Sequence, residues 1–277
     1  MAAPSSWPAP PKPTPPLRLN TFLHKRVIGV PASLTTTAPL SGTPTARFAP
    51  TRLAVTRARG ASNLLPLVAA VLVALPVFLQ APWVRLAPFS AALFTLPLLM
   101  SALVLESRPD QRLRDAGALL AGFSGSWLGG CLFWGWCRLH PLWHLPIEAF
   151  ALPLALAGLR GRWRLAASFY LASLLGTACT DAVMAITGVM GSWTTVLQAP
   201  LEQAPALLQQ AAQGVLEPLP LLVTGLTGSG LTLLCRRFWH HPDPAWRLAA
   251  SAVATTLAVD GLFLAAALWA PQLSGLI

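Results

Sequence analysis

Charged side chains are scarce in this chain of 277 residues. It contains 19 Lys or Arg and 9 Asp or Glu, so that only 10% of its residues are charged. In a soluble globular domain roughly a quarter of all residues are charged, and they cover its water-facing surface. The shortage excludes a water-soluble protein and agrees with a hydrophobic content of 55%. Four cysteines are also too few for a disulfide-stapled scaffold.

Acidic residues are absent from residues 1–60, which contain eight Lys or Arg, eleven Pro and thirteen Ser or Thr. Such a segment buries too little apolar surface to offset the entropy lost on ordering. We expect a disordered tail over residues 1–61 and a membrane domain over residues 62–277. The tail is typical of an organelle transit peptide, with a solvated cytoplasmic tail or an unused upstream start codon as alternatives. Its scattered basic residues offer no nucleic-acid-binding module.

Long apolar stretches fill the rest of the chain. A bilayer core of about 30 Å needs about 20 apolar residues per helix. Seven stretches meet or approach this length: Leu64–Leu79, Pro88–Leu105, Ala116–Trp136, Pro141–Leu159, Leu165–Met190, Leu216–Cys235 and Leu248–Trp269. The sequence therefore predicts an all-α, polytopic transmembrane helix bundle of seven spans, with the lipid bilayer as its partner.

Arginines in the loops predict the orientation of the bundle. Four loops on one side carry three arginines each, whereas those on the other side carry one or none. Because basic loops stay on the inner side of a membrane, the N-terminus is expected inside and the C-terminus outside. The segment from Gly191 to Gly214 is moderately apolar at helical spacing, and we interpret it as one outer amphipathic helix. An eighth buried or re-entrant helix is the alternative.

Ionisable side chains inside predicted spans are costly in lipid and call for a function. His144 and Glu148 lie in the fourth span, Asp181 in the fifth and Asp260 in the seventh. The three carboxylates lie at similar depth, about 10–14 Å below the outer surface at 1.5 Å per residue. They are the candidate proton or ion pathway, with His140 and Glu217 as secondary candidates. No Lys or Arg within a span can pair with them.

Other roles for these side chains stay open. The acids, if protonated, can hydrogen-bond across helix interfaces to nearby threonines: Thr177, Thr180, Thr187 and Thr255. His140, His144 and Glu148 have the i, i+4, i+8 spacing of metal ligands, but Pro141 and Pro146 weaken that pattern, and no metal is expected. The only cofactor considered is a haem or chlorophyll ligated by His144. Aromatic residues between 127 and 143 are interpreted mainly as an interfacial belt.

Glycines of the third and sixth spans are expected to let helices approach closely, as small residues do in membranes. The candidates are Gly122, Gly125, Gly129 and Gly228. Residues 122–125 also match the GxSG string of rhomboid-type serine proteases. Ser124 and His144, however, differ in predicted depth by about 13 Å, too far for a nucleophile and its base. We therefore expect no enzymatic activity.

Residues 132–159 read LFWGWCRLHPLWHLPIEAFALPLALAGL. This block resembles an uncharacterised family of cyanobacterial integral membrane proteins, and the likeness extends from about residue 62 to the C-terminus. The resemblance implies a cyanobacterial plasma or thylakoid membrane, with a plastid membrane as the alternative, and no assigned activity. Two functions are considered: a proton-linked transporter of a small solute or ion, and a non-catalytic scaffold subunit of a photosynthetic membrane complex that contacts other subunits and holds a pigment or haem.

The predicted topology can be tested with reporter fusions. Fusions after Ser107, Gly161 and Pro242 should report the inside, and a fusion at the C-terminus should report the outside, because three arginines retain each of these loops on the inner face. Compartment-specific activity of each reporter is the measurement. A single one of the first three fusions found outside contradicts the scheme.

Overall fold

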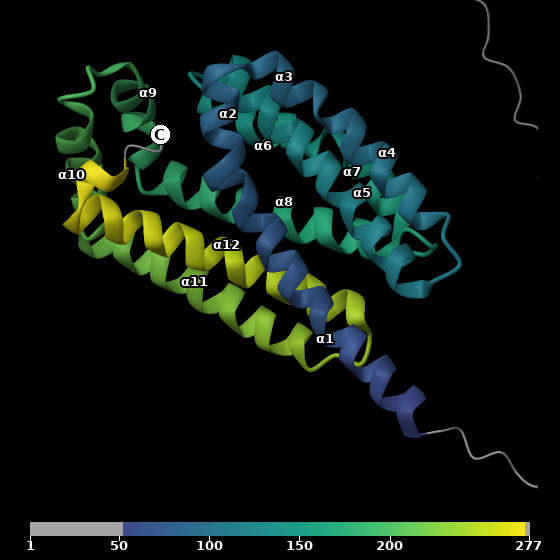
Figure 1. The fold of residues 1–277 in the computed structure, drawn as a ribbon. Coiled ribbons are helices and arrows are strands. Elements are labelled where there is room, and N and C mark those ends of the chain that lie inside the picture. Colours follow the sequence, from purple (N-terminus) through teal and green to yellow (C-terminus); the bar gives the residue numbers. More distant parts are fainter. Residues whose placement is uncertain (1–51, 275–277) are drawn as a thin grey trace, which may run out of the picture. The chain divides into compact units, whose positions relative to one another are not determined.

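The computed structural model describes residues 52–274, with side chains described from residue 64 to residue 272. These residues form helices and no strand (Figure 1). The α-helices are α1 Arg52–Leu75, α2 Ala81–Leu86, α3 Pro88–Leu93, α4 Thr95–Glu106, α5 Gln111–Leu132, α6 His144–Glu148, α7 Leu152–Gly158, α8 Arg164–Ile186, α9 Val189–Gln198, α10 Ala204–Val215, α11 Pro218–Trp239 and α12 Pro244–Trp269. The predicted tail lies outside the described residues up to residue 51, and α1 begins ahead of the predicted domain boundary.

Six segments of the described chain are long and apolar enough to cross a membrane. They are Leu64–Leu86, Pro88–Glu106, Gln111–Cys137, Arg164–Ile186, Pro218–Trp239 and Pro244–Trp269. Each of them contains or overlaps one of the seven predicted spans. The all-helical membrane fold and its lipid environment are therefore confirmed at this level.

The fourth predicted span, Pro141–Leu159, is not one continuous helix. It consists of a 3₁₀ turn at Pro141–Trp143, α6, a second 3₁₀ turn at Ala149–Ala151, and α7. Proline has no amide hydrogen and clashes with the carbonyl four residues earlier, so Pro146 and Pro153 each interrupt the helical ladder. The segment is therefore discontinuous at its prolines, which include the Pro146 that weakens the helical pattern in the sequence, and it is not among the six continuous candidate spans.

Two long helices on either side of this broken segment run in the same direction. A Cβ atom on Gly122 of α5 would lie 2.5 Å from the carbonyl oxygen of Ala166 in α8, and one on Gly125 would lie 3.2 Å from the ring of Tyr170. Contacts thus advance together along both helices. Such approach of backbones is possible only where one helix carries glycine.

The broken segment runs antiparallel to both of these helices. Glu148 in α6 lies beside Gly129, near the end of α5, and its carboxylate accepts a hydrogen bond from Thr177, late in α8. A Cβ atom on Gly158, at the end of α7, would instead lie 3.4 Å from Cβ of Ala167, near the start of α8. The segment therefore returns the chain from the end of α5 towards the start of α8.

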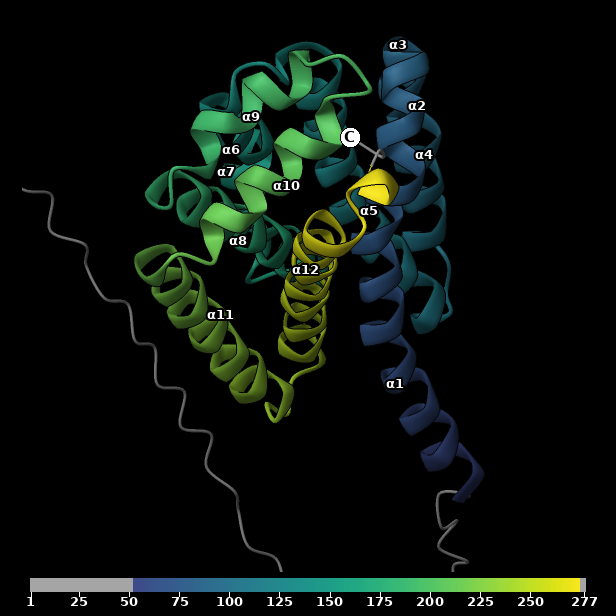
Figure 2. The same cartoon turned by 90° about the vertical axis from the view of Figure 1, so that its left-hand side faces the viewer.

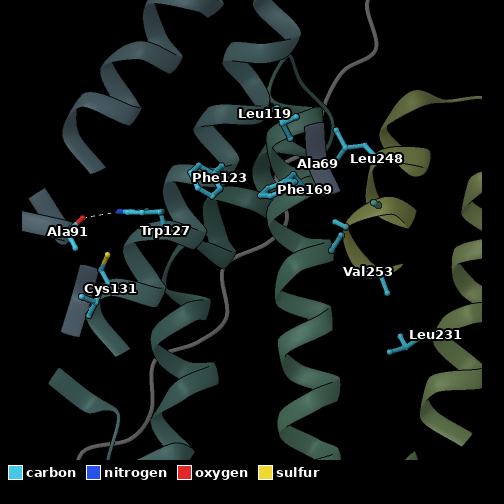
Figure 3. Packing of buried hydrophobic residues seen from close by; sticks show 14 residues of the cluster. Ala69, Ala91, Leu119, Phe123, Trp127, Cys131, Phe169, Leu231, Leu248 and Val253 are labelled. Atoms are coloured by element: carbon cyan, nitrogen blue, oxygen red, sulfur yellow. Dashed lines mark hydrogen bonds between the residues drawn. The ribbon is translucent and has the colours of Figure 1, made fainter. Parts of the chain in front are cut away.

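A compact core of buried hydrophobic residues joins α1, α5, α8 and α12 (Figure 3). Trp127 is fully buried, and its indole nitrogen donates a 2.9 Å hydrogen bond to the carbonyl of Ala91 in α3. Phe123 packs between Trp127 and Phe169 of α8. Trp127 and Phe133 are both buried, so the interpretation of these two residues as an interfacial belt is wrong. Their rings fill the space between helices instead.

The segment expected to be one amphipathic helix forms two, α9 and α10, separated at Pro200. The indole of Trp193 donates to the carbonyl of Arg138, and the amide of Gln209 donates to the carbonyl of Leu268. Both acceptors lie at the C-terminal ends of long helical segments. The pair α9 and α10 therefore lies across one end of the bundle (Figure 2), and neither is among the candidate spans.

Three of the four glycines expected at helix interfaces meet a neighbouring element: Gly122, Gly125 and Gly129. Gly228 differs, because a Cβ atom there would have no described heavy atom within 4 Å. The packing role of Gly228 therefore stays a prediction, without a neighbouring helix among the described residues. Its face of α11 borders open space instead of a helix, since α11 packs chiefly on α12 (Figure 2).

These two kinds of glycine predict opposite responses to one added methyl group. Gly122→Ala should lower the unfolding free energy by about 1–3 kcal/mol, because the backbones of α5 and α8 must separate. Gly228→Ala is the matched control. It should leave the unfolding free energy unchanged or raise it by up to about 1 kcal/mol, because alanine has a higher helix propensity than glycine. Thermal unfolding of both purified variants in detergent measures the difference, and equal melting temperatures contradict the packing account.

Candidate functional site

A cavity of about 790 Å³ opens beside the broken segment. Its walls come from α1, α5, α6 and α8 through α12, and its lining is mostly apolar. The cavity reaches into the part of the chain that was predicted to cross the membrane. All four principal candidates lie in its lining: His144, Glu148, Asp181 and Asp260.

His144 bridges two of the carboxylates. Its Nδ1 lies 3.0 Å from Oδ1 of Asp181 in α8, and its Nε2 lies 3.3 Å from Oε1 of Glu148, one turn later in α6. The three side chains are between 15% and 19% exposed. Ion pairs so shielded from water are held more strongly than surface pairs.

His144, Glu148 and Asp181 form one contiguous polar unit. The Nδ1 contact with Asp181 has hydrogen-bond geometry, whereas the Nε2 contact with Glu148 is a close contact between two chargeable groups. Carboxylate oxygens only accept, so a neutral imidazole, which has one ring hydrogen, can donate to only one of the two carboxylates at a time.

Two threonines of α8 extend the network towards α12. Thr177 donates a 3.0 Å hydrogen bond to Oε2 of Glu148, and Thr180 donates a 2.6 Å hydrogen bond to Oδ2 of Asp260. Asp181 also acts electrostatically on Asp260. Threonine partners for the acids were anticipated from the sequence. Thr187 and Thr255 instead bond to carbonyls of their own helices.

The ring of His144 is fixed by the aromatic wall. Phe133 stacks on it at 4.2 Å with the planes inclined by 31°, and Trp134 meets it edge-on at 6.5 Å. Both come from the π-helical turn Phe133–Cys137 that extends α5, a distortion often found at functional sites. Both ring nitrogens face carboxylates in this arrangement, and ligation of haem or chlorophyll by His144 stays a prediction.

The backbone at the break is satisfied by Tyr170. Its hydroxyl donates to the carbonyl of Glu148 and accepts from the amide of Ala151. The side chain is 4% exposed, so water does not replace these bonds. A single tyrosine within an apolar helix gives no signal in the sequence, and its role was missed.

The secondary candidates lie apart from this network. His140 and Glu217 are not in the cavity lining; His140 precedes a 3₁₀ turn, and Glu217 precedes the first residue of α11. Within the described residues, no group of three or more His, Cys, Asp or Glu is arranged to hold a metal ion. The Ser124 hydroxyl donates to the carbonyl of Leu120 in its own helix.

One cavity residue was missed by the sequence-based analysis. Gln80 is 3% exposed and ends the π-helical turn Pro76–Gln80, after α1. Its amide nitrogen donates to the carbonyl of Trp127 at 2.5 Å and lies 2.9 Å from Sγ of Cys131. In the sequence it follows the end of the first apolar stretch, where a glutamine looks like an ordinary loop residue.

The family described as "Protein of unknown function (DUF3120)" matches residues 69–268, a range that includes the whole network described above. The chain belongs to this family. The resemblance to an uncharacterised membrane-protein family is thereby confirmed. No curated protein and no solved structure matches the chain.

The role of Tyr170 can be tested by removing one oxygen atom. Tyr170→Phe should lower the unfolding free energy by about 1–3 kcal/mol, because the carbonyl of Glu148 and the amide of Ala151 lose their partner. Hydrogen exchange at residues 148–152 should also accelerate. Thr255→Val is the control, since that hydroxyl bonds only to Ser251 of its own helix. Unchanged exchange in Tyr170→Phe would show that the break is held by other contacts.

Proposed function

We propose that this protein is a proton-linked transporter of a small solute, with the cavity as its binding site. The observation that supports it is the convergence of His144, Glu148, Asp181 and Asp260 on one cavity from three separate elements. A structural role needs each buried acid to find a partner, but does not need four such groups to share an enclosed space. A transporter needs its acids to have partners and also to share one space, because bound protons and bound solute must influence each other.

The discontinuous segment supports the same proposal. Broken helices near the membrane midplane are a common feature of transporter binding sites, because the interrupted backbone lines a cavity. α6 is joined to α8 through His144 and Asp181, a contact whose strength depends on protonation. When a proton neutralises one carboxylate, the attraction between α6 and α8 falls. Proton occupancy thus biases the position of the wall against which the solute binds.

The path of the chain favours seven crossings. α5 and α8 are parallel, so the residues between them must return the chain along the same length, and the α6–α7 segment does so. The six continuous spans with this discontinuous one make seven. With the arginine-rich loops inside, the N-terminus lies inside and the C-terminus outside, and α9 and α10 cover the outer end.

A scaffold subunit is the second candidate, and α11 is the observation that favours it. Only 6% of its most apolar window is buried, and a Cβ atom added to Gly225, Gly228 or Gly230 would meet no described atom within 4 Å. A face of small residues can receive a helix of another membrane subunit. For location we propose a cyanobacterial plasma or thylakoid membrane, or alternatively a plastid membrane, on the composition of the tail and the family resemblance.

Charge-removing substitutions separate the two candidates. Glu148→Gln and Asp260→Asn keep the shape of the side chain but cannot titrate, so each should abolish solute-dependent proton movement while the protein stays folded. The protein is reconstituted in vesicles with an internal pH dye and a clamped membrane potential. Amines, amino acids, sugars, carboxylates and phosphate are added in turn, and the change in internal pH is recorded.

The matched control is Glu202→Gln, an exposed acid outside the cavity, which should behave as the wild type. If both cavity variants move protons as fast as the wild type, the carboxylates of Glu148 and Asp260 have no part in transport. If no solute in the panel moves protons through the wild type, the transporter proposal is overturned in favour of the scaffold.

A further inference from the structure

We propose that the cavity binds a small organic cation, a protonated amine attached to an apolar body. The proposal deepens the transport function above and rests on it for its biological meaning, but it concerns binding and can be tested without transport. Four independent features of the lining carry it: the charge of the network, the use of its hydroxyls, the amide of Gln80, and the aromatic wall.

The network has more acceptors than donors. His144 is the only nitrogen donor that faces the carboxylates of Glu148 and Asp181 among the described residues. One oxygen of Asp181 and one of Asp260 receive no hydrogen bond from any described residue. Three carboxylates with one imidazole leave a deficit of positive charge in one mostly apolar cavity. A cation or further protons must neutralise it, because an unpaired buried charge is costly.

The hydroxyl groups nearest the carboxylates do not change this balance. Thr177 and Thr180 have already given their hydrogens to Glu148 and Asp260. Other threonines of the lining donate to backbone carbonyls of their own helices: Thr187, Thr232 and Thr256. These oxygens can only accept from a ligand. The remaining hydroxyls of the lining can act either way: Ser126, Ser173, Thr224 and Thr227.

Gln80 adds an acceptor on the opposite wall. The carbonyl of Trp127 can only accept, so the amide nitrogen of Gln80 must be the atom that faces it. The same nitrogen lies against Sγ of Cys131, which accounts for its second hydrogen. The side-chain oxygen Oε1 receives no hydrogen bond from a described residue, but this atom is not fully buried, and Gln80 lines the cavity. An amide oxygen accessible from the cavity can accept a hydrogen bond from a ligand that brings a donor.

Gln80 and Glu148 lie at the same level of the cavity. Gly130 of α5 faces the amide of Gln80, and the adjacent Gly129 faces Glu148. The two acceptors are therefore at similar heights along α5, on faces about 100° apart. A primary ammonium group has three hydrogens in a tripod and can donate to several acceptors of the lining, which a metal ion of fixed coordination does less readily.

Aromatic residues of the cavity lining indicate the chemistry of the rest of the ligand. Phe133 and Trp134 from the end of α5, Phe169 of α8 and Trp193 of α9 all line the cavity. Their apolar surface suits an apolar body, and aromatic faces attract a cation held in front of them. A volume of about 790 Å³ lies within the range of roughly 300–1,000 Å³ typical of small-molecule sites.

Two arginines also line the cavity, and they could suggest an anionic ligand. Arg85 follows Gln80 by five residues, and Arg138 follows Gly130 by eight, so both lie about 7–12 Å nearer the end of the bundle covered by α9. Arg85 already has an interaction partner. An anion held by these arginines would therefore bind away from the carboxylates and leave them uncompensated.

The test is binding to the full-length protein in detergent, without a gradient. Three probes share one apolar body and differ in charge: phenethylamine, 2-phenylethanol and 3-phenylpropionate. Thermal stabilisation and calorimetry give the affinity of each. We expect phenethylamine to bind at least about tenfold more tightly than the alcohol and the acid. Tighter binding of 3-phenylpropionate, or no binding of phenethylamine, tyramine, benzylamine and butylamine alike, overturns the proposal.

Variants locate the site. Asp260→Asn and Asp181→Asn should weaken phenethylamine binding at least about tenfold, and Gln80→Met should weaken it less, since it removes an uncharged acceptor. Glu202→Gln should bind as the wild type. If Asp260→Asn unfolds at too low a temperature to assay, the affinity of Asp181→Asn for phenethylamine is the deciding measurement. Unchanged amine binding in whichever variant folds contradicts the proposed location of the site.

The outcome is separable from that of the transport experiment. Amine binding without solute-dependent proton movement in vesicles contradicts the transporter but keeps the cation site. Proton movement driven by a sugar or a carboxylate, with no amine binding, keeps the transporter and contradicts the cation site.

Discussion

A helix broken inside a membrane exposes carbonyl and amide groups that lipid cannot hydrogen-bond, and the break persists only where the protein supplies partners. Here a single hydroxyl does so, because Tyr170 of α8 donates to the carbonyl of Glu148 and accepts from the amide of Ala151. That hydroxyl fixes the turn between α6 and α7. The direction in which the Glu148 side chain leaves the turn, the position of His144 one helical turn earlier, and the wall of the cavity between α6 and α8 all depend on it.

Glycines of α5 bring three elements around the cavity together. Gly122 lets α5 approach α8, and Gly129 lets it approach α6, so that these elements meet without intervening side chains. In the same stretch Phe123, Trp127 and Phe169 are buried and pack on one another (Figure 3). The ionisable side chains of the network lie in the lining of the cavity, which explains how so many of them are tolerated within predicted spans.

Much of the fold follows from the sequence, because the length and hydropathy of the apolar stretches suffice to predict the six continuous spans. The convergence of His144, Glu148, Asp181 and Asp260 was also predictable, since acids in lipid must face an interior. The break was not predictable, because prolines such as Pro146 are compatible with a kinked helix as well as a broken one. Which face of a helix a glycine occupies is equally hidden: Gly122 and Gly228 lie in similar patterns, yet one meets a backbone and the other open space. Gln80 and Tyr170 gain their roles only from tertiary contacts.

Packing also determines which parts of the structure can move. α5, α8 and α12 are held together where Gly122 meets Ala166 and Gly176 meets Thr256, at distances that leave no room for sliding. The two flanks of the cavity are held differently. α6 is attached to α8 through polar contacts, which are the His144–Asp181 pair and the hydrogen bonds from Thr177 and Tyr170 to Glu148. α11 instead packs chiefly on α12 and presents glycines to open space. A change in protonation of the His144–Asp181 pair acts on α6. α11 can then shift without losing close backbone contacts. Rearrangement of the cavity is therefore expected at α6 and α11, around a fixed frame of three parallel helices.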